Sequence, residues 1–225
     1  MNTTVTATGM QVKASTASSL VITDTAANIN TTATNTQGMT ANTSSLVPAT
    51  HLIPATHSLT YTEGDSYLVY VSNPGDVDAV TGYAQSGKTL TYAKCVNADP
   101  VFYYIDYTVY IASKGAEITG QDLKATITPD TSKALYNAIS IDYWLNDSYV
   151  VTDSFADAAD AETVLSNGTI PSASAASNNY LTVKMRVYFD GALESGTAGT
   201  AYVNNGNVDV NAVTFSVAFA ISSHA

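Results

Sequence analysis

Hydrophobic and polar residues alternate along three long stretches of the chain, Val101–Ala112, Tyr180–Phe189 and Val213–Ile221. In the last two, every second side chain is apolar, and the positions between carry mostly Thr, Ser, Lys, Arg or Ala. This period of two predicts half-buried β-strands whose apolar faces turn toward a core. We expect three phenylalanines on these faces to be largely buried: Phe189, Phe215 and Phe219.

Shorter segments show the same strand character: Tyr67–Val71, Thr89–Val96, Leu123–Thr128 and Ile139–Trp144. Turn-forming residues separate the strands: Asn73-Pro74-Gly75, Asn167-Gly168, Asp190-Gly191 and Asn205-Gly206. Only the segment Ser154–Leu165 predicts a helix, with Asp153 or Ser154 as its N-cap. Many strands, frequent turns and almost no helix predict an all-β fold, an antiparallel two-sheet sandwich of jelly-roll type.

The opening segment, Thr3–Ala14, also alternates between polar residues and small or apolar ones, and its β-branched residues favour a strand. Residues 1–60 contain only two charges, Lys13 and Asp24, so little protects such a strand from pairing with another chain. We therefore predict that residues 1–14 are an N-terminal donor strand that completes the sheet of a neighbouring subunit. Four side chains are expected to fill the neighbour's pockets and set the register: Val5, Ala7, Met10 and Val12.

The remainder of the chain divides into two parts. Residues 15–60 are rich in Thr, Ala, Ser and Asn, with prolines at positions 48 and 54, and are expected to form an extended low-complexity arm laid over a surface. Residues 61–225 carry the long strands and are expected to form the jelly-roll domain. No internal repeat of fixed period is present in the sequence.

The composition narrows the class of partner. Of 225 residues, 45% are hydrophobic and only 12% are charged, and eight basic residues oppose 19 acidic ones for a net charge of −11. Nucleic acid is not expected as a partner, because phosphate binding needs a basic footprint. Anionic lipid is disfavoured for the same reason. Many Tyr and Thr with few Lys or Glu favour a secreted, extracellular or cell-surface protein.

No run of eighteen apolar residues predicts a membrane span. We expect the sequence to be a mature form whose export signal has been removed. Cys95 is the only cysteine, so no intramolecular disulfide can form, and a small buried hydrophobe is the best interpretation of this residue.

The segment Gly82–Thr89 (GYAQSGKT) satisfies the GxxxxGK[ST] pattern of a phosphate-binding loop. In a true phosphate loop, the segment opens a helix whose first amides hold the phosphates. Here the residues that follow read as a strand, so a hairpin loop between strands is the favoured interpretation and nucleotide binding is not expected.

Two histidines, His51 and His57, flank Pro54, and this proline excludes a helix that would place both histidines on one metal ion. Together with His224, they are expected to be solvated loop residues rather than ligands of a weak metal site. Acidic residues gather at two places: Asp76 and Asp78, then Asp153, Asp157, Asp160 and Glu162. Acidic surface turns are the favoured interpretation of both groups, and calcium sites are the alternative. Five N-x-[ST] triplets make glycans possible, beginning at Asn2, Asn30, Asn42, Asn146 and Asn167. No cofactor is expected.

Several of these segments together resemble the TasA/camelysin family of secreted bacterial and archaeal surface proteins. The similar parts are the strand and Asp-Gly turn within Leu181–Leu193, the strand Val213–Ile221, the central strand Tyr103–Ser113 and the opening Ala7–Ala14. The resemblance implies a jelly-roll subunit that polymerises into extracellular fibres through an N-terminal strand. Camelysins are described as metalloproteases, but this sequence shows no constellation of metal ligands to support that activity.

The leading hypothesis is therefore a non-enzymatic structural protein, a subunit of an extracellular surface or biofilm-matrix filament that polymerises head-to-tail with itself by donor-strand exchange. The alternative is a monomeric carbohydrate- or surface-binding jelly-roll module. Three aromatic residues would then stack on sugar rings: Tyr143, Trp144 and Tyr149.

Overall fold

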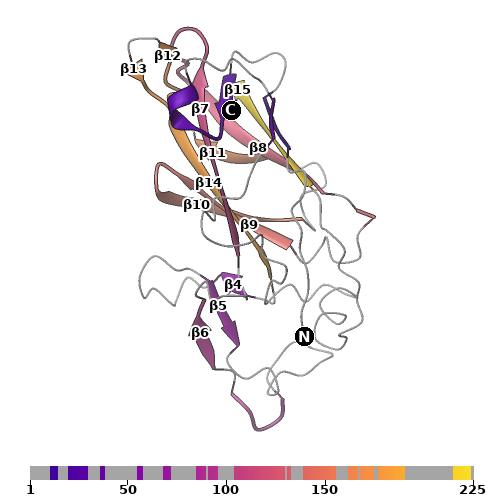
Figure 1. Cartoon of the computed structure of the whole chain (residues 1–225). Coiled ribbons are helices and arrows are strands. Elements are labelled where there is room, and N and C mark those ends of the chain that lie inside the picture. Colours follow the sequence, from indigo (N-terminus) through magenta and orange to yellow (C-terminus); the bar gives the residue numbers. More distant parts are fainter. Residues whose placement is uncertain are drawn as a thin grey trace.

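A computed structural model gives the arrangement of the chain (Figure 1). It describes the following residues: 11–14, 20–29, 36–38, 55–57, 68–71, 85–89, 91–95, 104–129, 131–132, 139–155, 162–166, 168–174, 177–190 and 215–223. Within them the protein is all-β, and the single short helical turn is a 3-10 helix at Ala26–Asn28. None of the helices in this part of the chain is long and apolar enough to cross a membrane.

The first large sheet, named here the β15 sheet, has five strands in the order β11-β8-β15-β1-β3. Their bounds are Glu162–Ser166, Gln121–Pro129, Phe215–Ser223, Gln11–Ala14 and Thr36–Gly38. Neighbouring strands run antiparallel, except that β1 runs parallel to β15. Of the strands that the structure describes, the first in sequence thus lies beside the last.

The second large sheet, the β14 sheet, is antiparallel throughout and has the order β10-β9-β14-β7-β2. Its strands are Ser148–Ser154, Ile139–Leu145, Leu181–Phe189, Ile105–Ser113 and Leu20–Thr23. On β14 the apolar residues Leu181, Val183, Met185 and Val187 all lie in the core, as the period of two predicts.

One hydrophobic core lies between these two sheets. It joins side chains of β7, β9 and β14 on one side to side chains of β8, β11 and β15 on the other. Tyr107 of β7 meets Phe215 of β15 edge to face, with ring centroids 6.5 Å apart, and Phe155 meets the same ring at 5.0 Å. The fold is therefore a β-sandwich, which confirms the expected all-β architecture. The β14 sheet is antiparallel as expected, whereas the β15 sheet is mixed because β1 runs parallel to β15.

A small antiparallel sheet of three strands, β4-β5-β6, lies below the sandwich in Figure 1. Its strands are Thr56–His57, Leu68–Val71 and Tyr92–Lys94. It packs on the outer face of the β14 sheet, where buried Leu68 and Cys95 meet Tyr188. A two-stranded hairpin, β12 (Ala173–Ser174) with β13 (Ser177–Asn178), completes the described strands.

Two expectations from the sequence need correction. The helix predicted at Ser154–Leu165 is wrong at both ends, because Ser154 ends β10 and Leu165 belongs to β11. Leu165 is buried in the core, and this packing outweighs the helix propensity of the alanine and glutamate residues in the segment. In addition, residues 15–60 supply β2, β3 and β4, and β2 is buried, so these three segments of the arm belong to the sheets.

Candidate functional site

The position of β1 is the feature of the fold that bears on assembly. Backbone partners pair Gln11 with Ser216 and Ala14 with Phe219 along β15, and Val12 faces Gln37 of β3 on the other side. Within the single chain, β1 is thus an interior strand of its own sheet. The placement expected from the sequence, between strands of a neighbouring subunit, is not what this chain shows for residues 11–14.

Of the four side chains predicted at the subunit interface, Val5, Ala7 and Met10 lie outside the described residues. Val12 lies in β1 and its backbone pairs with Val217 of β15. The structure therefore brings one of the four predicted positions to β15.

The strand beside β1 is suited to bury a partner. β15 carries no charged residue, and its other edge is paired with β8 along all nine of its residues. Its inward side chains are in the core: Phe215 is 4% exposed, and Val217 and Phe219 are 0% exposed. This confirms the predicted burial of Phe215 and Phe219, whereas the side chain of Phe189 lies outside the described part. Since β8 occupies one edge of β15, a partner strand can pair only along the edge that β1 occupies.

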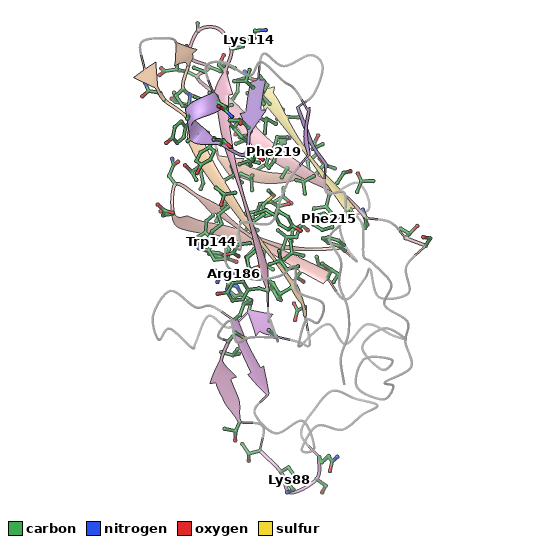
Figure 2. All side chains as sticks on the ribbon, in the orientation of Figure 1. Lys88, Lys114, Trp144, Arg186, Phe215 and Phe219 are labelled. Atoms are coloured by element: carbon green, nitrogen blue, oxygen red, sulfur yellow. The ribbon has the colours of Figure 1, made fainter. Side chains whose placement is uncertain are left out.

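A second feature, missed from the sequence, is a buried polar cluster on the outer face of the β14 sheet. Pairing across the sheet places Thr152 of β10 opposite Asp142 of β9, Asp142 opposite Arg186 of β14, and Arg186 opposite Asp106 of β7. Four consecutive strands thus contribute one row of polar side chains. The small sheet packs over this face beside the row (Figure 2).

Arg186 is the centre of the row. Its Nε and Nη2 atoms donate to the two carboxylate oxygens of Asp106, both at 2.8 Å, and its guanidinium lies 3.7 Å from the ring centre of Tyr104 and 5.2 Å from that of Trp144. Burial alone would lower the pKa of Arg186, but the hydrogen bonds and negative charge of Asp106 outweigh it, so the pKa is raised. The guanidinium is held charged and bidentate, which makes it a structural link.

Asp142 is fully buried and accepts hydrogen bonds from three directions. Thr152 Oγ1 donates to its Oδ1 at 2.6 Å, Tyr188 Oη donates to the same oxygen at 3.2 Å, and Nδ1 of His57 lies 3.2 Å from its Oδ2. Burial, followed by the charges of Asp142 and Asp190, raises the pKa of Tyr188 well above its usual range, so the phenol remains a donor. The cluster fixes the small sheet to the sandwich.

His57 differs from its sequence interpretation. It was expected as a solvated loop histidine, but it lies in β4, is mostly buried and stacks on Tyr149 with ring centroids 4.9 Å apart. His51 and His224 lie outside the described residues. Among the residues that the structure does describe, no group of three or more His, Cys, Asp or Glu could hold a metal ion.

The phosphate-loop pattern ends in an exposed turn. Residues 85–89 are all exposed, Gly87 has a φ of 76°, and the amide of Lys88 donates to the carbonyl of Gln85 at 2.9 Å. The turn lies in the connection between β5 and β6, which pair with each other, and Figure 2 places Lys88 at the tip far from the sandwich. The pattern is followed by strand β6, as expected for a hairpin loop, and not by the helix that a phosphate loop requires.

The aromatic residues considered for sugar stacking do not form an open platform. Tyr143 is 0% exposed on the core face of β9, and Trp144 on the opposite face is 4% exposed, with Lys184 Nζ 4.4 Å from its ring centre. Only Tyr149 is partly exposed. Since stacking needs an accessible ring face, the sequence-based alternative loses two of its three residues.

Of the acidic residues considered for calcium, Asp76, Asp78, Asp157 and Asp160 lie outside the described part of the chain. Asp153 accepts from the amide of Ser154 at 2.8 Å and from Thr163 Oγ1 at 2.6 Å, so it links β10 to β11. Glu162 forms an ion pair with Lys124 at 2.9 Å. Cys95 is buried, and this burial raises the pKa of its thiol to about 12, which agrees with an inert packing role.

Comparison with known proteins gives no family, because no protein-family model, no curated protein and no solved structure matches this chain.

Proposed function

We propose that this protein is the structural subunit of an extracellular filament, with a jelly-roll-type sandwich whose copies are joined by exchange of the N-terminal strand. The observation that carries the proposal is the site of β1, which pairs with the one edge of β15 that β8 leaves open. Only residues 15–19 connect β1 to β2 in the opposite sheet. The backbone hydrogen bonds that β15 forms with its own β1 can also form with β1 of another copy.

Exchange costs little in contact energy, and a high subunit concentration lowers its entropic cost. An exchanged strand makes the hydrogen bonds and side-chain contacts of the closed chain, so the two arrangements differ chiefly in the connection and in the entropy of association. Five connecting residues span at most about 17 Å when extended, which requires the neighbouring subunit to lie in direct contact. A head-to-tail contact of this kind need not close, so it propagates as a fibre.

Charge supports the same proposal. β1 carries one charged residue, Lys13, and β15 carries none, so pairing them buries almost no charge. In the exchanged form, Val5, Ala7, Met10 and Val12 are the residues expected to contact the neighbour. A net charge of −11 per subunit keeps finished fibres from associating freely.

Deleting residues 1–14 tests the proposal. We expect the truncated protein to remain soluble as single subunits that form no fibres in electron microscopy, and a peptide of residues 1–14 to bind it. Val12→Asp should also block fibres, because it places a charge beside the core strand β15. Lys88→Ala, in an exposed turn, is the matched control and should assemble normally. Fibres formed by the truncated protein would contradict the proposal.

A further inference from the structure

The hairpin between β9 and β10 exposes a short polar tip. Asn146 and Asp147 form its two-residue turn, and their φ angles of 48° and 65° are both positive, as a tight hairpin of this hand requires. Asn146, Asp147 and Ser148 are all exposed, whereas β9 before them is largely buried and β10 after them is half-buried. The tip therefore projects from the sandwich into solvent.

Hydrogen bonds to the neighbouring strand orient the Asn146 side chain. The backbone amide of Asn146 donates to the carbonyl of Thr182 at 2.8 Å, and Oδ1 of Asn146 accepts from the amide of Thr182 at 2.9 Å. Because Oδ1 faces β14, the Nδ2 branch of the same amide points away from that strand. The nitrogen is thus presented on a fixed, exposed turn.

This tip is also an acceptor triplet. Asn146-Asp147-Ser148 fits N-x-[ST] with no proline at the middle position. Of the five triplets in the chain, it is the one that lies entirely within the described residues. Sequence and exposure therefore agree at this position.

We propose that Asn146 is an N-glycosylation site, an inference that rests on the extracellular location in the proposed function. The co-substrate is a lipid-linked oligosaccharide, used by an export-associated transferase. Nδ2 of Asn146 attacks the anomeric carbon of the first sugar, the bond from that carbon to the lipid phosphate oxygen breaks, and the lipid phosphate leaves with the bonding electrons. Nδ2 loses one proton to a base of the transferase, so atoms and charge balance.

The location of the tip is compatible with a filament. β10 lies at the edge of the β14 sheet that contacts β11, whereas β1 contacts β2 at the opposite edge of that sheet. A glycan at Asn146 is therefore on the side of the sandwich away from the strand-exchange position. It adds a hydrated layer to the fibre surface and leaves the β15 edge accessible.

Glycopeptide mass spectrometry of the full-length protein, purified from the cells that make it, tests the site. Chymotryptic cleavage after Trp144 and Tyr149 isolates residues 145–149 from the triplet at Asn167. We expect this peptide to carry a sugar mass and to release sugar fragment ions. Ser148→Ala should abolish the modification while keeping the Asn146 turn, and Ser148→Thr should retain it. Asn179→Gln, an exposed asparagine outside any triplet, is the control and should change nothing.

An unmodified peptide in this material would overturn the proposal. If that same protein is found outside the cells and forms fibres, the glycosylation site alone fails. If it is retained inside the cells and forms no fibres, the proposed function fails with it. Fibres of Ser148→Ala should form as in the parent, since the variant leaves β1 and β15 unchanged.

Discussion

Replacing Arg186 with methionine should destabilise the sandwich strongly, although the new side chain has a similar length. Arg186 is 7% exposed and its guanidinium makes two 2.8 Å hydrogen bonds to Asp106. Its removal leaves the carboxylates of Asp106 and fully buried Asp142 without the cation between them. Breaking a buried ion pair by removing one partner costs about 3–5 kcal/mol. For a chain of this size, that lowers Tm by about 6–20 °C.

Urea unfolding followed by tryptophan fluorescence is the direct assay. Trp144 is the only tryptophan, and its ring lies 5.2 Å from the Arg186 guanidinium, so its emission reports on this cluster. Arg186→Lys should have an intermediate effect, because it keeps the charge but loses the bidentate geometry. The double change Asp106→Leu with Arg186→Met should recover part of the loss, because it removes one unpaired carboxylate together with the cation. A loss below about 1 kcal/mol for Arg186→Met would refute the reasoning, since it lies in the range of exposed pairs.

Three further results are expected. Phe219→Ala should lower the unfolding free energy by about 3–5 kcal/mol in the same urea titration, because the ring is 0% exposed, and a loss under 1 kcal/mol would contradict its core position. Lys88→Ala should leave stability unchanged, and calorimetry should detect no ATP binding to the parent; micromolar binding that the variant loses would refute the hairpin interpretation. Cys95 should not react with a thiol reagent at pH 8 until the protein is unfolded, because its pKa is raised to about 12. The buried, protonated thiol should contribute stability that is fully present below about pH 9, the pKa in the unfolded chain, and that is lost as the pH rises toward 12. Rapid labelling of the thiol in the native protein would contradict its burial.

The long strands were predictable because one of their faces is buried. On β14, for example, every second residue from Leu181 to Val187 lies in the core, and only one register achieves this. The sequence could not show which strands pair, because an alternating strand fits beside many others. The parallel contact between β1 and β15 was therefore not expected.

The errors have identifiable physical causes. The predicted helix at Ser154–Leu165 followed local propensity, but burial of Leu165 between the sheets decides for a strand. The buried polar cluster has only a weak signal in the sequence: Asp106, Asp142 and Arg186 each lie on the strand face opposite the core, where polar residues are ordinary in a half-exposed strand. These three residues meet only because their strands are neighbours in the sheet. They are buried only because the small sheet, which is distant in sequence, packs over that face.

Disulfide trapping detects the exchange of β1 between copies. Lys13 and Ala218 are backbone partners, and adjacent strands lie about 4.8 Å apart, within the range that a disulfide can join. Lys13→Cys and Ala218→Cys are prepared as separate proteins, mixed, assembled and oxidised, while buried Cys95 remains unreactive. If β1 is exchanged, covalent dimers containing one copy of each variant form, and they form only in fibres. Fibres that assemble from the mixture but yield no such dimers would contradict the exchange.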